Sequence, residues 1–308
     1  MILSAKKTHG IRMDKGSRIY TIIVYSLVTL LTLIITYPLY FCIIASFSDP
    51  DAVAMGDTIF WFKGFTFEAY TSILGEKSIL TGYRNSMLYM LLGTSYNMLL
   101  TIPTAYVLSK KDLPGHKGIL WFFFITMYFS GGLIPTYIWY KDIGLVDNPL
   151  VMIIGSGVSA YNMIVARQFF MASIPETLYE AAEIDGASEL RKFFVIALPL
   201  AKPILAVIGL YYAFAKWNSY YTSLLYLRDQ TYWPLQLVLR QILIASEQLV
   251  NELATINSQD ADYLVRKLYM VRAMKYAIIL VASVPMLILY PFVQKYFTKG
   301  VMVGAIKG

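Results

Sequence analysis

Residues 19–48 read IYTIIVYSLVTLLTLIITYPLYFCIIASFS and contain no charged side chain. The hydrocarbon core of a bilayer is crossed by about 20 mostly apolar helical residues, because backbone N–H and C=O groups find no water there. The run is much longer than the apolar core of a secretory signal peptide, which has about 7–15 residues, and no clear small-residue cleavage site follows it. We therefore interpret it as an uncleaved first membrane span.

Five further apolar runs follow the first one. They cover residues 85–109, 118–140, 148–166, 203–227 and 276–294, and only Lys216 interrupts the run at 203–227. The sequence therefore predicts an all-α polytopic membrane protein with six transmembrane helices. The fourth and fifth runs also admit the alternative of a re-entrant or buried segment.

Composition agrees with a membrane protein. Hydrophobic residues make up 57% of the chain and charged residues 15%, whereas soluble domains carry about 25% charge. The net charge of +7 would suggest nucleic-acid binding in a soluble protein. Here the basic residues flank the apolar runs, which is typical of membrane orientation, and we expect no nucleic-acid partner. A single cysteine, Cys42, excludes an internal disulfide.

Six spans place both termini on one side of the membrane. The segments on that side carry more Lys and Arg than the opposite segments, so we expect both termini to be cytoplasmic. The predicted organisation is a tail at 1–18, a permease domain at 19–294 and a tail at 295–308. Two long segments, 49–84 and 228–275, then lie outside. The second is predicted to be partly helical from the spacing of Leu235, Val238, Leu239 and Ile242.

The cytoplasmic loop at 167–202 is the most patterned connection. Ser173 and Glu176 fit a capping box, and Gly186 is a natural helix stop. Ser188 is suited to cap a second short helix that Pro199 ends. On the first helix, one face contains Leu178, Ala181 and Ala182 and another contains Glu176, Glu180 and Glu183; the second helix has an apolar face of Leu190, Phe193, Phe194 and Ala197. One face can pack under the bundle, and the acidic face with its small alanines is suited to a groove on a soluble partner.

At these residues the chain resembles the permeases of bacterial ABC importers. Glu180-Ala181-Ala182, Gly186, Ile196 and Leu198-Pro199 fit the family's EAA loop at every defining position. The resemblance extends along most of the chain and is strongest to the second permease of maltose-type carbohydrate importers, in particular to subunits that import larger oligosaccharides. The supporting motifs are Pro38, Ser46-Phe47, Ala105-Tyr106, Ile134-Pro135, Gly144-Leu145, Phe169, Ile174-Pro175-Glu176 and Trp217-Asn218.

The resemblance implies a type I importer fold and a set of partners in the bacterial plasma membrane. Glu180, Ala181, Ala182, Asp185 and Gly186 would form a coupling helix seated in a cleft of an ATP-binding subunit dimer. ATP and Mg²⁺ would be bound there, with no cofactor in this chain. A second permease, expected to be a paralogue, would complete the pathway, and an extracytoplasmic binding protein would deliver the carbohydrate for alternating access.

Three consecutive residues are candidates for the substrate pathway. Lys216, Trp217 and Asn218 fall near mid-depth of the fifth run, where a charge faces protein or water by default. Trp217 can stack on a sugar ring and Asn218 can bond its hydroxyls, but both also suit helix packing. For Lys216, a salt bridge or backbone contact inside the bundle is the competing interpretation. Further candidates, by depth alone, are Tyr128, Tyr137, Tyr161, Tyr220 and Tyr221.

No catalytic or metal-binding constellation is present in the sequence. The chain has no G-x-x-x-x-G-K-[ST] motif, so we expect a transport subunit that hydrolyses no ATP itself. The alternative of an ion-coupled secondary transporter would normally show intramembrane Asp, Glu or His and a two-half repeat. A membrane-embedded enzyme would need convergent acids, His or Cys near a membrane face. The sequence offers neither pattern.

Overall fold

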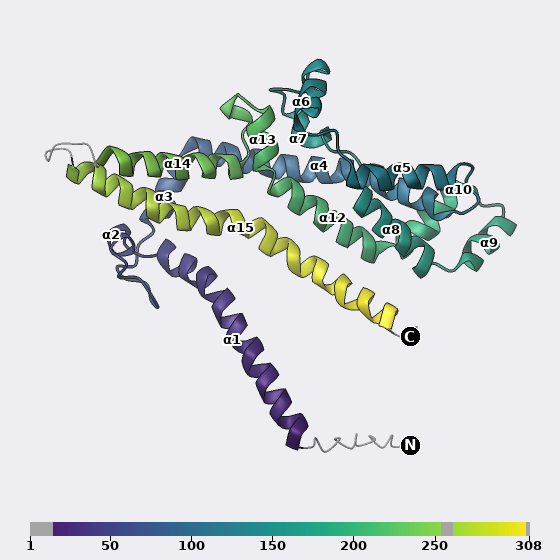
Figure 1. The fold of residues 1–308 in the computed structure, drawn as a ribbon, viewed down its shortest axis with the longest axis horizontal. Helices are drawn as coiled ribbons and strands as arrows, with labels where there is room; N and C mark the ends of the chain where they lie inside the picture. Colours follow the sequence, from purple (N-terminus) through teal and green to yellow (C-terminus); the bar gives the residue numbers. More distant parts are fainter. Residues whose placement is uncertain (1–14, 254–260, 306–308) are drawn as a thin grey trace.

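The computed structural model describes residues 15–253 and 261–305, and this part of the chain is helical without any strand. Long helices lie roughly along the longest axis of the molecule, and the chain passes back and forth between its two ends (Figure 1). One end carries the hairpin of α14 (Leu235–Leu253) and α15 (Ala261–Ala305), and the other carries α9 (Glu176–Ile184). We call these the α14 end and the α9 end.

The bundle is built on α4 (Lys77–Ser109), α8 (Ala160–Ser173), α12 (Lys202–Trp217) and α15. Small residues allow these helices to approach closely, as is usual in membrane proteins. Ala105, Ala166 and Ala197 are completely buried where α4, α8 and the segment before α12 meet. On α4, a Cβ added to Gly82 would lie 3.2 Å from the Leu235 Cα, so glycine permits α14 to pack on α4.

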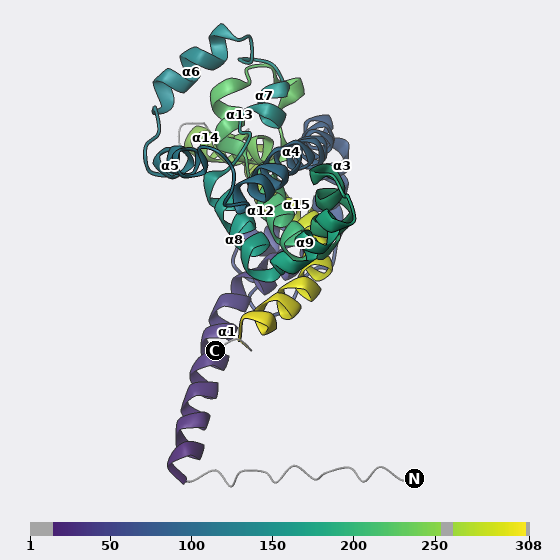
Figure 2. The ribbon, with the colours of Figure 1, turned by 90° about the vertical axis from the view of Figure 1, so that its right-hand side faces the viewer.

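α1 (Lys15–Ser46) contacts the rest of the molecule mainly near its C-terminal end, where it meets α15. Its N-terminal half leaves the bundle alone in both views (Figures 1 and 2). Pro38 lies inside this helix. In the described residues, α1 and α15 are long and apolar enough to cross a membrane, and up to four spans result if each bent helix pair is one span.

Three predicted spans are interrupted, and two of the breaks lie between α5 (His116–Tyr128) and α8. The run at 118–140 is not one helix, because α5 and α6 (Leu133–Asp142) meet at 112°. Gly131 and Gly132 lie in the break, and Gly132 has φ of +85°, a conformation that side-chain-bearing residues rarely adopt. The run at 148–166 is likewise broken into α7 (Leu150–Ile154) and α8 by an unwound segment, residues 155–159.

The loop at 167–202 contains two helical pieces, as predicted, but the second does not end at Pro199. The second piece consists of α10 (Glu189–Arg191), a π-helical turn η1 (Lys192–Ala197) and α11 (Leu198–Leu200), which follow one another without a gap. Pro199 lies in the first turn of α11, where the N–H that proline lacks is not needed. The chain then bends by 81° into α12.

The remaining elements lie toward the α14 end. The predicted run at 203–227 contains α12 and α13 (Tyr220–Tyr226), which break at Asn218 and Ser219, and a 3-10 turn η2 (Gln230–Tyr232) leads to α14. The helix predicted from Leu235, Val238 and their neighbours is confirmed by α14. α2 (Pro50–Ala54) and α3 (Glu68–Gly75) precede α4.

The predicted tails are only partly described. Residues 1–14 of the expected N-terminal tail and 306–308 of the C-terminal tail lie outside the described residues. α15 continues through residue 294, the predicted end of the last span, as far as Ala305.

Candidate functional site

The first candidate surface is the α9 region, where the sequence predicts the coupling helix. The predicted capping box is wrong: Ser173 is the last residue of α8, and Pro175 is the N-cap of α9 without a side-chain cap. A helical Ser173 cannot take the extended conformation that an N-cap needs. The structure instead joins α8 to α9 through two extended residues, Ile174 and Pro175.

Gly186 ends α9 as predicted. It has φ of +74°, its N–H donates to the Glu183 carbonyl at 3.0 Å, and the Ala187 N–H donates to the Ala182 carbonyl at 2.9 Å. These two bonds form a Schellman motif, which satisfies carbonyls that the helix end leaves free. No atom lies within 4 Å of a Cβ added at Gly186, so the requirement for glycine is conformational and not steric.

Lys192 connects the two helical pieces of this loop. Its side chain is buried, yet Nζ lies 2.5 Å from Glu189 Oε1 and 3.3 Å from Glu183 Oε2 in the last turn of α9. The hydrogen bonds to Glu189, first, and to Glu183 raise the pKa of Lys192 and hold it charged. The predicted cap is also present, because Ser188 Oγ accepts from the Arg191 N–H at 3.3 Å. The loop is therefore one braced unit.

Tyr106 of α4 connects this unit to the bundle. Its ring lies 5.0 Å from Phe193 of η1, 5.7 Å from Phe170 of α8 and 6.1 Å from Tyr179 of α9. Lys110, just after α4, places Nζ 3.3 Å from the Tyr179 ring centre, a cation–π contact. Burial, first, and neighbouring Tyr106 raise the pKa of Tyr179 to about 12, so its ring is neutral. α9 and α4 are therefore in direct contact through these rings.

The rest of α9 faces outward. Of its residues only Tyr179 is buried, whereas Leu178 and Ala181 are exposed and Ala182 is half-buried. Tyr179 is therefore the residue of α9 that packs under the bundle, and Leu178 and Ala181 lie on the outward side. Leu190 and Phe194 are likewise exposed, while Phe193 and Ala197 are buried as predicted. Glu180, Asp185 and Gly186 are also exposed, so α9 offers a small, acidic and partly apolar surface.

Removal of Lys192 tests the brace. Lys192→Met removes two charge pairs with exposed carboxylates, at a cost of about 1 kcal/mol. We therefore expect local unfolding of α9 and η1 to be roughly fivefold more frequent. Hydrogen exchange of residues 176–197 measures this. Lys111→Met, at an exposed lysine outside α9 and η1, is the control. Equal exchange in both variants would contradict the brace.

The second candidate surface is the unwound segment, residues 155–159, between α7 and α8. Irregular backbone inside a membrane protein needs hydrogen-bond partners from its neighbours. Asn97 of α4 donates Nδ2 to the carbonyls of Ser156 and Gly157, and the Tyr140 hydroxyl donates to the carbonyl of Gly155. Two other elements, α4 and α6, therefore stabilise the break.

Lys216 of α12 completes this arrangement. Nζ donates to the Met152 and Ile153 carbonyls at 2.9 and 3.0 Å, at the C-terminal end of α7, and lies 3.4 Å from Ser156 Oγ. Cations are favoured at helix C-termini. The stem of Lys216 packs on Gly93 of α4, where an added Cβ would lie 2.7 Å from the Lys216 Cε. No carboxylate pairs with Lys216 among the described residues.

Tyr212, one turn earlier on α12, holds the start of α8. Its hydroxyl accepts from the Ser159 N–H at 3.0 Å and lies 2.6 Å from Thr101 Oγ1 of α4. Ser159 in turn caps α8 by accepting from the Asn162 N–H at 3.4 Å. The break is thereby fixed at both of its ends.

A cavity of about 500 Å³ opens beside this segment. Its polar wall contains hydroxyl, amide, ammonium and backbone groups, and its aromatic wall contains three tyrosines. Pockets that bind small polar ligands combine these two features. The lining includes Ser156, Ser159, Asn162, Lys216, Ser219, Thr222, Tyr140, Tyr212 and Tyr226. We call it the Lys216 cavity.

The structure separates the three predicted pathway residues. Lys216 lines the Lys216 cavity, whereas Trp217 is buried against α15 and donates Nε1 to the Ala282 carbonyl at 3.1 Å. Asn218 bonds the Phe214 carbonyl of its own helix at 3.0 Å and shares with Trp217 the lining of a different hollow, of about 420 Å³, beside α15. Neighbouring helical residues point about 100° apart, so one helix could not aim all three at one ligand.

Other tyrosines than the predicted ones line the Lys216 cavity. Tyr128, Tyr161, Tyr220 and Tyr221 are exposed, and Tyr137 stacks on Tyr226 at 5.9 Å. None of these five belongs to the cavity lining. The signal in the sequence is Gly155-Ser156-Gly157, since two glycines in an apolar run mark a helix break.

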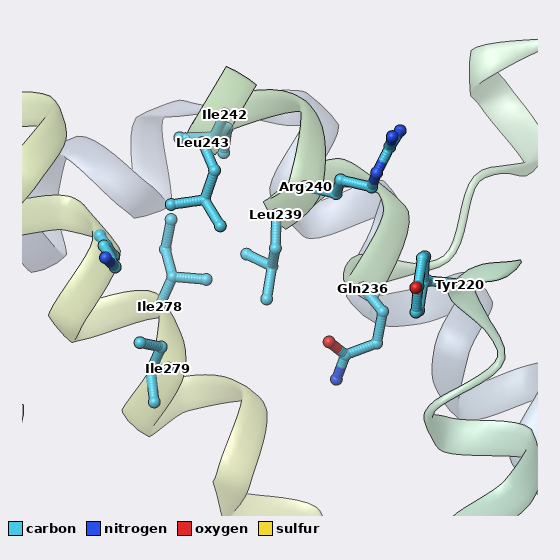
Figure 3. A pocket seen from close by; sticks show the side chains of 9 residues that line it. Tyr220, Gln236, Leu239, Arg240, Ile242, Leu243, Ile278 and Ile279 are labelled. Atoms are coloured by element: carbon cyan, nitrogen blue, oxygen red, sulfur yellow. The ribbon is translucent and has the colours of Figure 1, made fainter. Parts of the chain in front are cut away.

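A third hollow, of about 410 Å³, lies between α13, α14 and α15. Leu239 and Ile278 point into it and Arg240 points away, as Figure 3 shows. Its walls are mainly apolar, with Gln236 and Tyr220 at one side. Lys275 also belongs to its lining, and its walls are otherwise more apolar than those of the Lys216 cavity.

We expect the hydrogen bonds from Asn97 to the unwound segment, residues 155–159, to contribute to the stability of the protein. Asn97→Ala would leave two buried carbonyls without their donor, at about 1–3 kcal/mol. We expect a lower melting temperature in detergent, measured by a thiol-independent thermal assay. Leu99→Ala, at an exposed position two residues further along α4, is the control. Equal melting temperatures for the two variants would exclude this role of Asn97.

An all-helical membrane chain with a broken helix over a polar cavity, and with a braced exposed loop at one end, defines a transport protein of the bundle type. The chain belongs to the family described as binding-protein-dependent transport system inner membrane components, whose model matches residues 78–303. It is the permease subunit of an ABC importer. The ion-coupled secondary transporter is not supported.

Curated relatives and a solved structure agree. The chain is 36% identical over 292 residues to the polygalacturonan/rhamnogalacturonan transport system permease protein YtcP of Bacillus subtilis, covering 95% of this chain and 99% of that protein. It is 28% identical to the galactooligosaccharides transport system permease protein GanQ of the same organism, over 92% and 94% of the two chains. A chain of a bacterial ABC transporter for import of the acidic polysaccharide alginate matches with a TM-score of 0.83 and 31% identity, over 94% of this chain and 100% of that one.

Proposed function

We propose that this chain forms half of the pathway by which a bacterium imports an oligosaccharide, and that sugars bearing carboxylates are favoured. The observation that carries the proposal is Lys216, an ammonium on the wall of a polar cavity without a carboxylate partner among the described residues. Two of the similar proteins handle acidic glycans by their names, polygalacturonan and alginate. A positive wall would attract such substrates.

We further propose six membrane passes with both termini in the cytoplasm. The passes are α1, α4, α5 with α6, α7 with α8, α12 with α13, and α15. The alternating course of these elements between the α9 end and the α14 end supports this count (Figure 1). The α9 end is then cytoplasmic, in agreement with the excess of Lys and Arg in the segments there.

Three partners would contact three different surfaces of this chain. An ATPase subunit would receive α9 in a cleft, bind ATP and Mg²⁺, and move Tyr179 and Tyr106 as it closes. A second permease, expected to be a paralogue, would face the Lys216 cavity from the opposite side. An extracytoplasmic binding protein would release sugar into the pathway at the α14 end.

Co-purification and uptake test this function. We expect the tagged full-length chain, extracted from its native membrane in mild detergent, to bring a P-loop ATPase and a second permease. Vesicles with this complex and its binding protein should take up labelled oligogalacturonide at the expense of ATP, and faster than a neutral galacto-oligosaccharide. A stable chain without any ATPase would contradict the importer, and equal uptake of both sugars would contradict the preference for carboxylates.

A further inference from the structure

The segment after α2 folds back along α1. Lys63, in the later part of this segment, is bound to the residues that follow α1. The Asp49 N–H donates to the Lys63 carbonyl at 2.9 Å, and the Lys63 N–H donates to Ser48 Oγ at 3.2 Å. Figure 1 shows this segment descending beside the last turns of α1. The chain between α2 and Lys63 therefore forms a hanging loop.

Two tyrosines of α1 hold the lowest part of this loop. The Tyr40 hydroxyl donates to the Phe60 carbonyl at 2.6 Å, and the Tyr37 hydroxyl donates to the Ile59 carbonyl at 3.2 Å. Tyr37 and Phe60 also place their rings 6.1 Å apart. At 1.5 Å per residue, Tyr40 and Tyr37 lie about 9 and 14 Å before the end of α1 at Ser46. The loop tip is thus fixed well below the end of a membrane-spanning helix.

The side chains at the tip are large, apolar and uncovered. Phe60 is 74% exposed, Trp61 66% and Ile59 50%. The charged residues of the loop, Asp57 and Lys63, pair with each other at 3.6 Å and leave the tip without charge. Such a cluster is unfavourable in water and marks a surface that another apolar phase covers.

The depth of the tip identifies that phase. The apolar part of α1, Gly16–Ser46, has 31 residues; it is about 46 Å long, against about 30 Å for the hydrocarbon core. A centred helix projects about 8 Å beyond the core at each side, so a tip 9–14 Å below Ser46 reaches the boundary of headgroups and acyl chains. Aromatic side chains concentrate at this boundary.

We propose that residues 59–61 are a membrane anchor, inserted into the leaflet at the Ser46 end of α1. Two backbone carbonyls of the tip, those of Ile59 and Phe60, have hydrogen-bond partners in the two tyrosines, as polar backbone groups near lipid require. A soluble protein approaching from the aqueous side would meet α2 before this tip. The anchor fixes the C-terminal end of α1, whose other half has no packing partner in the described chain. This inference does not depend on the substrate or on the ATPase.

Site-directed spin labelling in lipid vesicles tests the anchor. In the assembled transporter with Cys42→Ala, labels are attached at Phe60→Cys or Trp61→Cys, and at Glu76→Cys as an exposed, charged-site control. We expect collision with oxygen to exceed collision with a water-soluble nickel chelate at 60 and 61, and the reverse order at 76. Tyr40→Phe should shift the label at 61 toward nickel access, since it removes the bond that holds the tip.

Two results would overturn the anchor. Nickel access at 60 and 61 equal to that at 76 would place the loop in water. Low access to both oxygen and nickel would show that a protein, such as the second permease, covers the tip instead of lipid. Both labelled positions are exposed side chains, so neither substitution should prevent folding.

Discussion

Gly186→Pro is expected to abolish ATP-driven uptake and to release the ATPase from the permease. Proline fixes φ near about −65° and carries no N–H, whereas Gly186 has φ of +74° and donates to Glu183. Neither requirement can be met, so the Schellman turn must open. The local cost is several kcal/mol. α9 is a short helix with little stability of its own, so it cannot offset this cost.

The measurement is the amount of ATPase that co-purifies with the tagged chain, together with its binding-protein-stimulated activity. Gly186→Asn is the first control, since asparagine tolerates the left-handed conformation, and we expect it to retain both. Gly56→Pro is the second. Gly56 has nearly the same φ, +78°, but lies after α2, away from α9. Retention of a stimulated ATPase in Gly186→Pro would show that α9 is not the coupling element.

The local features of this loop could be predicted because each depends on a few neighbouring residues. Gly186 as a stop and Ser188 as a cap need only the geometry of one helix end. The failed capping box shows the limit of that reasoning. The pattern of Ser173 and Glu176 was present, but α8 extends to Ser173 and takes it as its own last residue.

The predicted apolar runs coincide with helices, but the sequence does not predict which of these helices are broken. A run without charges indicates lipid or protein surroundings, and it contains no information on where the backbone unwinds. Residues 155–159 break because Asn97, Tyr140 and Lys216, from three other elements, offer hydrogen bonds. Such partners are tertiary contacts, and only the two glycines beside Ser156 signal the break in the sequence.

The structure separates the substrate candidates for a related reason. Depth placed Lys216, Trp217 and Asn218 together, but depth does not determine the direction of a side chain around the helix. Trp217 points to α15, where Ala282 accepts its N–H, and Tyr83 packs on its ring at 5.8 Å. The interpretation of Trp217 as a packing residue, equally compatible with the sequence, agrees with these contacts.

Lys216→Met is expected to reduce uptake of a carboxylate-bearing oligosaccharide about 10- to 100-fold, the effect of losing one favourable charge interaction of about 1.5–3 kcal/mol. Methionine fills most of the space beside Gly93 without the charge. Uptake of a neutral galacto-oligosaccharide should fall less. The comparison is made in the same vesicles, with Asn218→Ala, two residues further along and outside the lining of the Lys216 cavity, as the control.

The ratio of the two uptake rates separates the two roles of the lysine. Its ammonium also donates to the Met152 and Ile153 carbonyls, so its removal weakens the end of α7 for any substrate. A structural loss lowers both rates by the same factor and leaves the ratio unchanged, which would refute a role in attracting carboxylates. Gly93→Ala sharpens the test, because the added Cβ displaces the lysine while the charge is retained. If the position of the ammonium matters as well as its charge, both variants should lower the ratio of the two uptake rates, and Lys216→Met should lower it further.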